Sequence, residues 1–401
     1  MTARPRLLAV IFLGFLGLAF AAGGLWWVLQ PPAPGPLRLT KISFAELPGW
    51  RQSDPRAALA AFQRSCAVLD KQEGAATMGY AGAVTDWRAP CHAAQSAGAA
   101  RGFFEHWFSP LEVSAGQVKE GLFTGYYEPE LYASRSRRGP FQTPVYGVPG
   151  DLVSVDLGQF RPQLHGEHIA GKVEGNRLIP YATRAEIDAH GAPKAHVLFY
   201  ADDPVAVFFL HIQGSGRVRF GDGSRERVAY GAQNGQIYTA IGKTLKLRGD
   251  LKPEEMSMQN IAAWLRAHPS AAREVMESDA SYIFFKEEPV GDPALGAKGA
   301  EGVALTPGAS LAVDTRLHSL GVPFFVSTAL PDAKPLQTLF VAQDIGGAIR
   351  GLVRGDIFFG FGKEAERSAG GMDQQGALFV LLPKPVAARL KAQTDYPAGT
   401  P

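Results

Sequence analysis

The most informative part of this sequence is AQDIGGAIRGLVRGDIFFGFG, residues Ala342–Gly362. Its apolar runs have the length of strands and are separated by glycines, which is typical of short strands joined by turns. Asp344 follows the predicted strand Leu339–Ala342, and Asp356 opens the next strand. Both carboxylates therefore lie at the border of an apolar strand, where glycines let a ligand approach the backbone closely.

A third aspartate, Asp314, ends the predicted strand Ser310–Val313. Aspartates at strand ends are often turn formers that bond their own backbone, and this is the simplest interpretation of all three. The sequence around Asp356 supports a second interpretation, a catalytic acid, because aromatic residues follow Asp356 closely. These are Phe358, Phe359 and Phe361. Apolar surroundings favour the protonated carboxyl, which is the form that a general acid for glycoside cleavage needs near neutral pH.

Two further stretches carry polar side chains beside glycines. GLFTGYYEP (Gly121–Pro129) contains Thr124, Tyr126 and Glu128, which are suited to stacking on a sugar and bonding its hydroxyls. The alternative is a strand end whose tyrosines alternate between core and surface.

The other stretch is HIQGSG (His211–Gly216), in which Gln213 and Ser215 could donate to a ligand or belong to a β-bulge. The apolar run Val205–Ile212 before it predicts a strand, with His211 as a core or edge histidine. Asp222-Gly223 predicts a hairpin turn.

Length and composition set the broad class. The chain has 401 residues, of which 46% are hydrophobic, enough for two or three domains. Helical spacing dominates residues 54–115 and recurs near 253–267, and short strands dominate from residue 121 onward. A net charge of +2 gives no support for binding nucleic acid through bulk charge. Two cysteines exclude a zinc site built on a cysteine cluster, and no HExxH, Walker or GxSxG motif is present.

The N-terminus predicts export from the cytoplasm. Arg4 and Arg6 precede an uncharged run, Leu7–Leu29, whose helix of about 35 Å would cross a bilayer core. It is either an uncleaved membrane anchor or a signal peptide cleaved at the small residues around Ala21. In an exported chain, Cys66 and Cys91 are expected as one disulfide or as two buried thiols.

Taken together, the motifs resemble the membrane-bound lytic murein transglycosylase A family over about residues 120–382. The matching runs are FTGYYEPEL (Phe123–Leu131), IPYATRAEI (Ile179–Ile187), HIQGSGRVRFGDG (His211–Gly223), NGQIYTAIGKTL (Asn234–Leu245), MSMQNIAAWL (Met256–Leu265), SYIFFK (Ser281–Lys286), LTPGASLAVD (Leu305–Asp314) and the stretch at Ala342–Gly362. No single run is decisive, but their common order is specific.

The resemblance implies a mainly β fold: a double-psi β-barrel domain with a second, smaller β-barrel domain inserted, plus N-terminal helices. The expected segments are a signal peptide or anchor (1–30), a proline-rich linker and lead-in (31–53), the helical part of the barrel domain (54–127), the inserted β domain (128–230), the C-terminal barrel part with a three-aspartate module (231–385) and a tail (386–401).

The resemblance also implies the reaction and the residues. The family cleaves the β-1,4 bond between N-acetylmuramic acid and N-acetylglucosamine in peptidoglycan and leaves 1,6-anhydro-muramyl ends, without a metal or an organic cofactor. Asp356 is expected as the single acid/base and Asp344 as the supporting carboxylate, although these two roles could be exchanged. Asp314 is expected to be structural. Positions expected to bind substrate are Thr124, Tyr126, Gln213 and Ser215.

The expected location is the periplasm of a Gram-negative envelope, with the chain either anchored in the inner membrane or secreted. Family members are commonly lipoproteins, but this chain lacks the cysteine that would carry the lipid. The expected partners are glycan strands, the membrane through the N-terminal segment, and proteins of the cell-wall machinery, with no nucleic acid. The competing hypotheses are a hydrolase on the same scaffold and a non-catalytic peptidoglycan-binding protein.

Overall fold

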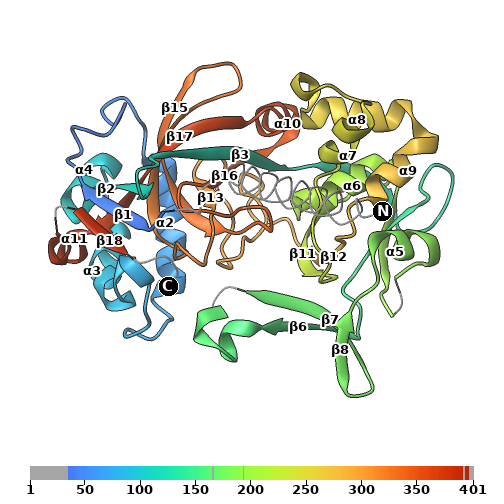
Figure 1. Ribbon diagram of the computed structural model, residues 1–401, viewed down its shortest axis with the longest axis horizontal. Helices are drawn as coiled ribbons and strands as arrows, with labels where there is room; N and C mark the ends of the chain where they lie inside the picture. Colours follow the sequence, from blue (N-terminus) through green and yellow to red (C-terminus); the bar gives the residue numbers. More distant parts are fainter. Residues whose placement is uncertain (1–34, 165–166, 193, 392, 397–401) are drawn as a thin grey trace, which may run out of the picture.

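The computed structural model describes residues 35–164, 167–192, 194–391 and 393–396. The predicted membrane segment Leu7–Leu29 lies outside these residues. Within them, no helix is long and apolar enough to span a membrane. Two β-rich bodies lie beside each other, with strand β3 (Glu120–Glu128) running from the first toward the second (Figure 1). The expected class, a mainly β chain with additional helices, is confirmed.

The first body is built on a nine-stranded sheet in the order β14-β15-β13-β16-β3-β17-β2-β1-β18. An additional pairing of β14 with β17 closes the strands from β14 to β17 into a ring, which is the expected double-psi β-barrel. Two pairs are parallel, β13 with β15 and β16 with β3. The remaining bounds are β1 Leu37–Lys41, β2 Phe108–Ala115, β13 Ser310–Ala312, β14 Pro323–Ala329, β15 Pro335–Asp344, β16 Gly355–Phe361, β17 Asp373–Pro383 and β18 Gln393–Tyr396.

Helices cover this barrel. They are α2 (Arg56–Leu69), α3 (Val84–Ala94), α4 (Ala100–Trp107), α10 (Gly362–Gly370) and α11 (Lys384–Arg389). Phe62 on α2, Trp87 on α3 and Phe104 on α4 are fully buried, and together they form an aromatic core. Cys66 and Cys91 form a disulfide that joins α2 to α3, which settles the alternative left open by the sequence.

The second body contains a six-stranded sheet in the order β12-β11-β10-β4-β9-β5 and helices that pack on it. Its strands are β4 Glu130–Ser134, β5 Thr143–Tyr146, β9 Val197–Ala201, β10 Gly216–Phe220, β11 Arg225–Gln233 and β12 Ile283–Glu288. Its helices are α5 Arg184–His190, α6 Pro204–Gln213, α7 Ile241–Arg248, α8 Met258–Ala267 and α9 Pro269–Glu277. Asp222 and Gly223 form the predicted turn between the antiparallel strands β10 and β11.

A separate three-stranded sheet, with strands β6 (Leu152–Asp156), β7 (His168–Glu174) and β8 (Arg177–Pro180), extends from the second body (Figure 1). The carboxylate of Glu167, just before β7, lies 3.2 Å from the guanidinium of Arg316 in the first body. This ion pair is a direct contact between the extension and the barrel.

The structure differs from the sequence prediction in the run Val205–Ile212, which forms helix α6 and not a strand. Asp203 caps this helix through its side chain, which accepts a hydrogen bond from the Val205 backbone N–H, and Pro204 occupies its first turn. The run is apolar on all sides because α6 packs between the six-stranded sheet and helices α7–α9. Periodicity alone cannot separate such a buried helix from a buried strand.

The sheets also differ from the expected segments. The six-stranded sheet continues through β11 and β12 to Glu288, whereas the inserted domain was expected to end at residue 230. The chain leaves this sheet after β11 to form α7–α9 and then returns to it. Strands β1 and β18 pair with each other, so the expected lead-in and tail both contribute to the barrel sheet.

Candidate active site

Strand register brings Asp344 and Asp356 onto one face of the barrel sheet. The short strand β13 lies between β15 and β16, and Ala312 is the partner of both aspartates, of Asp344 on one side and of Asp356 on the other. Neighbouring strands lie about 4.8 Å apart, so the two aspartate backbones are separated by about 10 Å. Ala312 between them is itself buried, in a small apolar cluster with Tyr126 and Phe358.

Asp356 is held by the neighbouring strand β3. Thr124 is its register partner, and the Thr124 hydroxyl donates to the Asp356 carboxylate at 2.6 Å. The guanidinium of Arg354 donates in turn to the Thr124 oxygen at 2.8 Å and is itself fixed by the backbone carbonyls of Leu122 and Gly355. A chain of hydrogen bonds from Arg354 through Thr124 therefore orients the Asp356 carboxylate.

Desolvation gives Asp356 the properties of an acid. It raises the pKa of the Asp356 carboxyl from 3.8 to about 6, against the opposing effects of the Thr124 hydrogen bond and the Arg354 charge. The negative charge of Asp344 acts in the same direction as desolvation. The side chain is only partly covered, so a ligand can reach it.

Asp344 is fixed more rigidly than Asp356. Its carboxylate accepts hydrogen bonds from the Tyr126 hydroxyl at 2.8 Å and from the Ala300 backbone N–H at 2.9 Å. The Ala300 N–H reaches Asp344 because the preceding residue, Gly299, has no side chain. A Cβ atom on Gly299 would come within 2.5 Å of the Gln343 backbone carbonyl oxygen. Burial still raises the pKa of Asp344 above its usual range. Two donors nevertheless favour its charged form, as a supporting carboxylate requires.

Asp314 follows strand β13 and has no exposed surface. It pairs with Arg316 at 2.7 Å and accepts a hydrogen bond from the Gly351 backbone at 2.9 Å. Burial acts to raise the pKa of Asp314, but these hydrogen bonds outweigh it and hold the pKa below its ordinary value. Gly351 belongs to the connection between Asp344 and Asp356, so Asp314 fixes that connection.

Gln213 and Ser215 come from the second body, at the end of α6 and at its junction with β10. The side-chain amide oxygen of Gln213 accepts a hydrogen bond from the Tyr127 backbone N–H at 2.9 Å, which ties the second body to β3 beside Tyr126. Ser215 is buried. Thr124 and Tyr126 thus lie on strand β3, and Gln213, at the end of helix α6, bonds the backbone of the same strand.

Glu128, which the sequence offered as a sugar-binding residue, is fully buried and is not available to a ligand. Its carboxylate pairs with Arg217 at 3.0 Å and with Arg227 at 2.9 Å, and it accepts a hydrogen bond from the Ala297 backbone N–H. These partners come from β10, β11 and the loop that returns to the barrel. Glu128 therefore holds the junction between the two bodies.

Sequence reasoning missed Tyr238, which lies in the loop 234–239 of the second body. Ile237 is 84% exposed and Tyr238 37%, which is unusual for adjacent large side chains. Burial, followed by the charges of Asp279 and Asp356, raises the pKa of Tyr238 to about 12. Tyr238 is therefore a partly exposed aromatic side chain whose pKa responds to the charge of Asp356.

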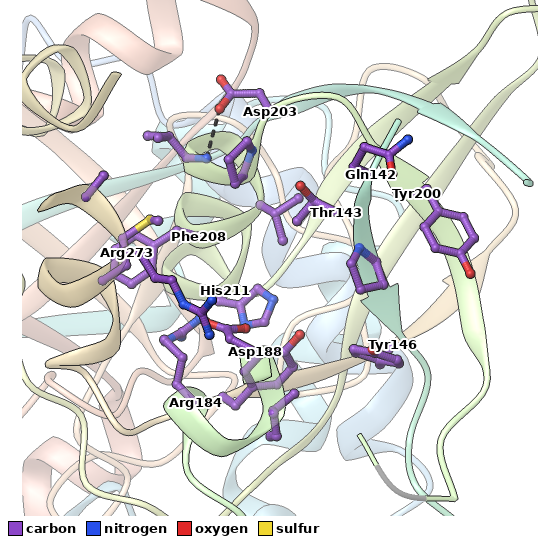
Figure 2. Close-up of a pocket in the computed structure, with 18 of the residues that line it drawn as sticks. Gln142, Thr143, Tyr146, Arg184, Asp188, Tyr200, Asp203, Phe208, His211 and Arg273 are labelled. Carbon is purple, nitrogen blue, oxygen red and sulfur yellow. Dashed lines mark hydrogen bonds between the residues drawn. The ribbon is translucent and has the colours of Figure 1, made fainter. Parts of the chain in front are cut away.

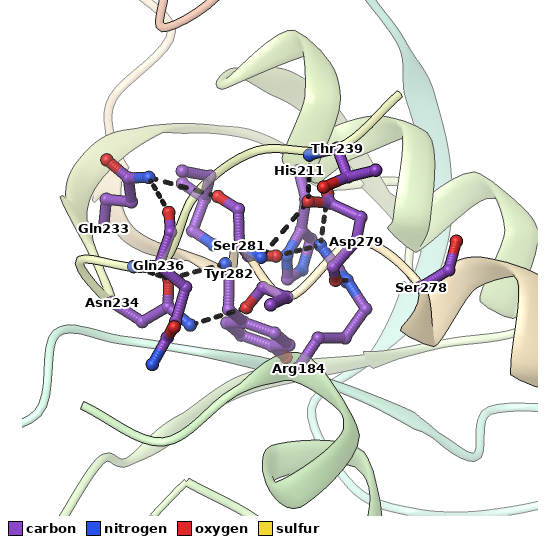
Figure 3. Close-up of polar contacts among 12 residues, drawn as sticks. Arg184, His211, Gln233, Asn234, Gln236, Thr239, Ser278, Asp279, Ser281 and Tyr282 are labelled. Carbon is purple, nitrogen blue, oxygen red and sulfur yellow. Dashed lines mark hydrogen bonds and ion pairs between the residues drawn. The ribbon is translucent and has the colours of Figure 1, made fainter. Parts of the chain in front are cut away.

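Polar contacts hold this loop in place (Figure 3). The buried Asn234 donates to the carbonyls of Ala182 and Ala280, and Asp279 accepts a hydrogen bond from the Thr239 backbone N–H at 2.9 Å. A side chain on Gly235, which has a φ of +79°, would overlap the Ala170 carbonyl of β7. The Asn-Gly pair at 234–235 was the sequence signal for such a tight loop.

In the described ranges of the chain, no group of three or more His, Cys, Asp or Glu side chains could hold a metal ion. The site consists of carboxylates, hydroxyls and amides beside aromatic rings. Tyr126 packs against Phe358 with ring centroids 5.1 Å apart. The carboxylates and donors are suited to proton transfer on a sugar, while the buried rings of Tyr126 and Phe358 belong to the core.

Comparisons with known proteins agree with this geometry. Residues 122–286 match the MltA specific insert domain, and residues 309–382 match the 3D domain. Membrane-bound lytic murein transglycosylase A of Escherichia coli (strain K12) is 34% identical over 276 residues, which make up 67% of each chain. The protein of the same name from Vibrio cholerae is 31% identical over 281 residues, 66% of this chain and 67% of the relative.

Solved structures show the same similarity. The membrane-bound lytic murein transglycosylase from Agrobacterium tumefaciens has a TM-score of 0.76 at 33% identity, covering 88% of this chain and 99% of that one. MltA from Neisseria gonorrhoeae in its monoclinic form has a TM-score of 0.74 at 33% identity, covering 92% and 100%. E. coli MltA with bound chitohexaose has a TM-score of 0.60 at 28% identity, covering 88% and 93%.

Proposed function

Since this chain belongs to the membrane-bound lytic murein transglycosylase A family, we propose that it cleaves the β-1,4 bond between N-acetylmuramic acid and N-acetylglucosamine in peptidoglycan. The chain is an enzyme, a lytic transglycosylase that acts on peptidoglycan. The finer proposal is that one aspartate, Asp356, performs the whole proton transfer and that the products end in 1,6-anhydro-muramic acid.

The observation that carries this proposal is the Asp356 carboxyl, half-buried, bonded to Thr124, and with its pKa raised to about 6. At pH 6, about half of such a group is protonated, against less than about 1% of a carboxyl with a pKa of 3.8. Protonated Asp356 gives its proton to the glycosidic oxygen, and the bond between that oxygen and C1 breaks. The departing sugar leaves as a neutral alcohol.

The second half of the reaction needs no further catalytic group. The muramyl C6 hydroxyl attacks C1 and forms the 1,6-anhydro ring, and its proton passes to the Asp356 carboxylate. Asp356 is thereby returned to its starting state, and no water is consumed. A hydrolase would need a second carboxylate as nucleophile or base, whereas here the substrate supplies the nucleophile.

Asp344 has a supporting role in this proposal. Two donors, Tyr126 and the Ala300 backbone N–H, hold its carboxylate in one orientation. From that position its charge stabilises the positive charge that develops at C1 in the transition state. Thr124 and Tyr126 orient the two carboxylates, and the Gln213 amide nitrogen and Ser215 hydroxyl bond the glycan. The E. coli relative with bound chitohexaose supports a site for β-1,4-linked sugars.

The test compares two variants, Asp356→Asn and Asp344→Asn, with Asp222→Asn in the exposed β10–β11 turn as a matched control. Loss of a general acid costs about 10²–10⁴ in rate, so we expect Asp356→Asn to lose at least that much and still bind glycan. Asp344→Asn should retain more activity, and the control should be unchanged. If Asp344→Asn is the more severe of the two, the roles are exchanged.

We also propose a location. The chain acts in the periplasm of a Gram-negative envelope, attached to the inner membrane through residues 7–29 or released from it. Relatives named membrane-bound and the absence of a lipid-bearing cysteine support this proposal. Fractionation of cells that produce the full chain tests it, because recovery in the cytoplasm would contradict it.

A further inference from the structure

A cavity lies in the second body, and neither Asp344 nor Asp356 lines it. It has a volume of about 790 Å³, within the range of ligand-binding pockets, and lies between helices α5, α6 and α9 and strands β5 and β9 (Figure 2). None of the residues assigned above to catalysis or glycan binding lines it. Two of its polar side chains, His211 and Asp188, have a bonding capacity that the described residues do not satisfy.

His211 is the first of these side chains. It is only 4% exposed, and its Nδ1 accepts a hydrogen bond from the Ile283 backbone N–H at 3.4 Å. Burial lowers the pKa of the imidazole, so the ring is neutral and its proton is on Nε2. Within the described residues, Nε2 has no hydrogen-bond partner. Figure 2 shows the ring at the cavity wall beside Asp188, so a bound acceptor can satisfy this donor.

Asp188, on α5, is the second. No hydrogen bond or ion pair to its carboxylate occurs among the described residues, although two arginines line the same cavity near it (Figure 2). Arg184 donates to the backbone carbonyls of Asp279 and Ser281, and Arg273 pairs with Glu277 at 2.6 Å. The Asp188 carboxylate is accessible and remains free for a cationic or hydrogen-donating group.

The lining offers donors for negative groups and one free acceptor for a positive group. Four arginines and two aspartates line the cavity, namely Arg137, Arg184, Arg266, Arg273, Asp188 and Asp203. His211 adds a neutral donor. Aromatic surface is supplied by Tyr146, Phe208 and Tyr282. Arg184, Arg266 and Arg273 are each partly used, by backbone carbonyls, by Asp203 and by Glu277 respectively, but every guanidinium has further N–H groups. A ligand that fits therefore carries carboxylates for those N–H groups, an amine for Asp188 and a carbonyl for His211.

We propose that this cavity binds a short acidic peptide with free carboxylates and one free amine, which is the chemistry of the stem peptides attached to the glycan strands of peptidoglycan. The proposal rests on the proposed function, because that function supplies the polymer on which such peptides occur. Helix α6 carries His211 toward the cavity and Gln213 toward β3. One helix thus connects a peptide site to the glycan site.

The test is calorimetric titration of the full chain carrying Asp356→Asn, which prevents turnover, with the tripeptide L-Ala-γ-D-Glu-meso-diaminopimelate. We expect saturable one-to-one binding. Adding Asp188→Asn should weaken it about tenfold, since one charge-assisted contact is lost. Adding Asp222→Asn, an exposed carboxylate of the same body, should change nothing. Among the residues that the structure describes, Asp188 has no hydrogen-bond or ion-pair partner, so we expect its substitution to leave the folded state intact.

Three outcomes would overturn the proposal: absence of binding at millimolar peptide, equal affinity in the Asp188→Asn chain, and displacement of the peptide by chitohexaose, which would place it in the glycan site. The proposed function is checked separately by the products of the unsubstituted chain on peptide-free glycan. Anhydro products without peptide binding would reject only the peptide site. Peptide binding without anhydro products would reject only the reaction.

Discussion

Replacing Thr124 by valine should move the pH profile of this enzyme upward. The Thr124 hydroxyl donates to the Asp356 carboxylate at 2.6 Å and thereby stabilises its charged form. Valine keeps the shape of the side chain and removes the donor. The neighbouring Arg354 is held by two backbone carbonyls and stays in place. The main change is therefore the loss of one hydrogen bond to a carboxylate.

The size of the effect follows from that bond. A hydrogen bond to a charged group contributes about 1.5–3 kcal/mol, and one pKa unit corresponds to about 1.4 kcal/mol. Taking the lower value, the pKa of Asp356 rises from about 6 to about 7. A general acid must be protonated to act, so activity is lost as the pH rises through this pKa. The alkaline limb of the profile should move upward by about one unit.

The assay is kcat/KM for release of soluble products between about pH 4.5 and 8.5, because kcat/KM reports the pKa values of the free enzyme. Thr328→Val is the matched control, since Thr328 lies on β14 and bonds only the Gln375 carbonyl among the described residues. The control should leave the midpoint unchanged. An unmoved or lowered midpoint in Thr124→Val would refute the assignment of the alkaline limb to Asp356.

Three further predictions concern the supports of the site. Tyr238→Ala should raise KM for glycan several-fold with little change in kcat, because the ring face contacts the sugar. Tyr238→Phe keeps that ring face and should retain most of the binding. Steady-state kinetics on soluble glycan measures both variants, and an equal loss in the two would show that the hydroxyl is the contact. Glu128→Gln should destabilise the fold by about 3–5 kcal/mol, because it leaves two arginines at a buried junction without their carboxylate, and denaturant unfolding with an unchanged midpoint would contradict this. Replacing both Cys66 and Cys91 by serine should cost about 3 kcal/mol in unfolding free energy while activity at 25 °C persists; reductant should have the same effect on the native chain and none on the variant.

The sequence allowed the strands and the carboxylates to be predicted together, because both are local features. Asp344 and Asp356 stand at the borders of apolar runs, and the structure places those runs at the ends of β15 and β16. Their separation across β13 depends on which strands pair. Pairing is a long-range property, so Ala312 could not be identified as the residue between them.

Other features depend on tertiary context. The run Val205–Ile212 forms a helix because apolar surfaces cover it on both sides, and its composition resembles that of a buried strand. Glu128 has a side chain of the type that binds sugar hydroxyls, but it is buried in ion pairs with two arginines distant in sequence. The position of Tyr238 depends on Asn234 and Asp279, which fix its loop through contacts distant in sequence.

The central claim is that a single aspartate cleaves the glycan with the substrate as its own nucleophile. The most direct measurement is digestion of purified sacculi with residues 31–401, followed by mass spectrometry of the soluble products. The account predicts muropeptides ending in 1,6-anhydro-muramic acid, one water lighter than reducing ends, and their disappearance with Asp356→Asn. Reducing-end products from the native chain would contradict it, since they require an attacking water and a second catalytic carboxylate.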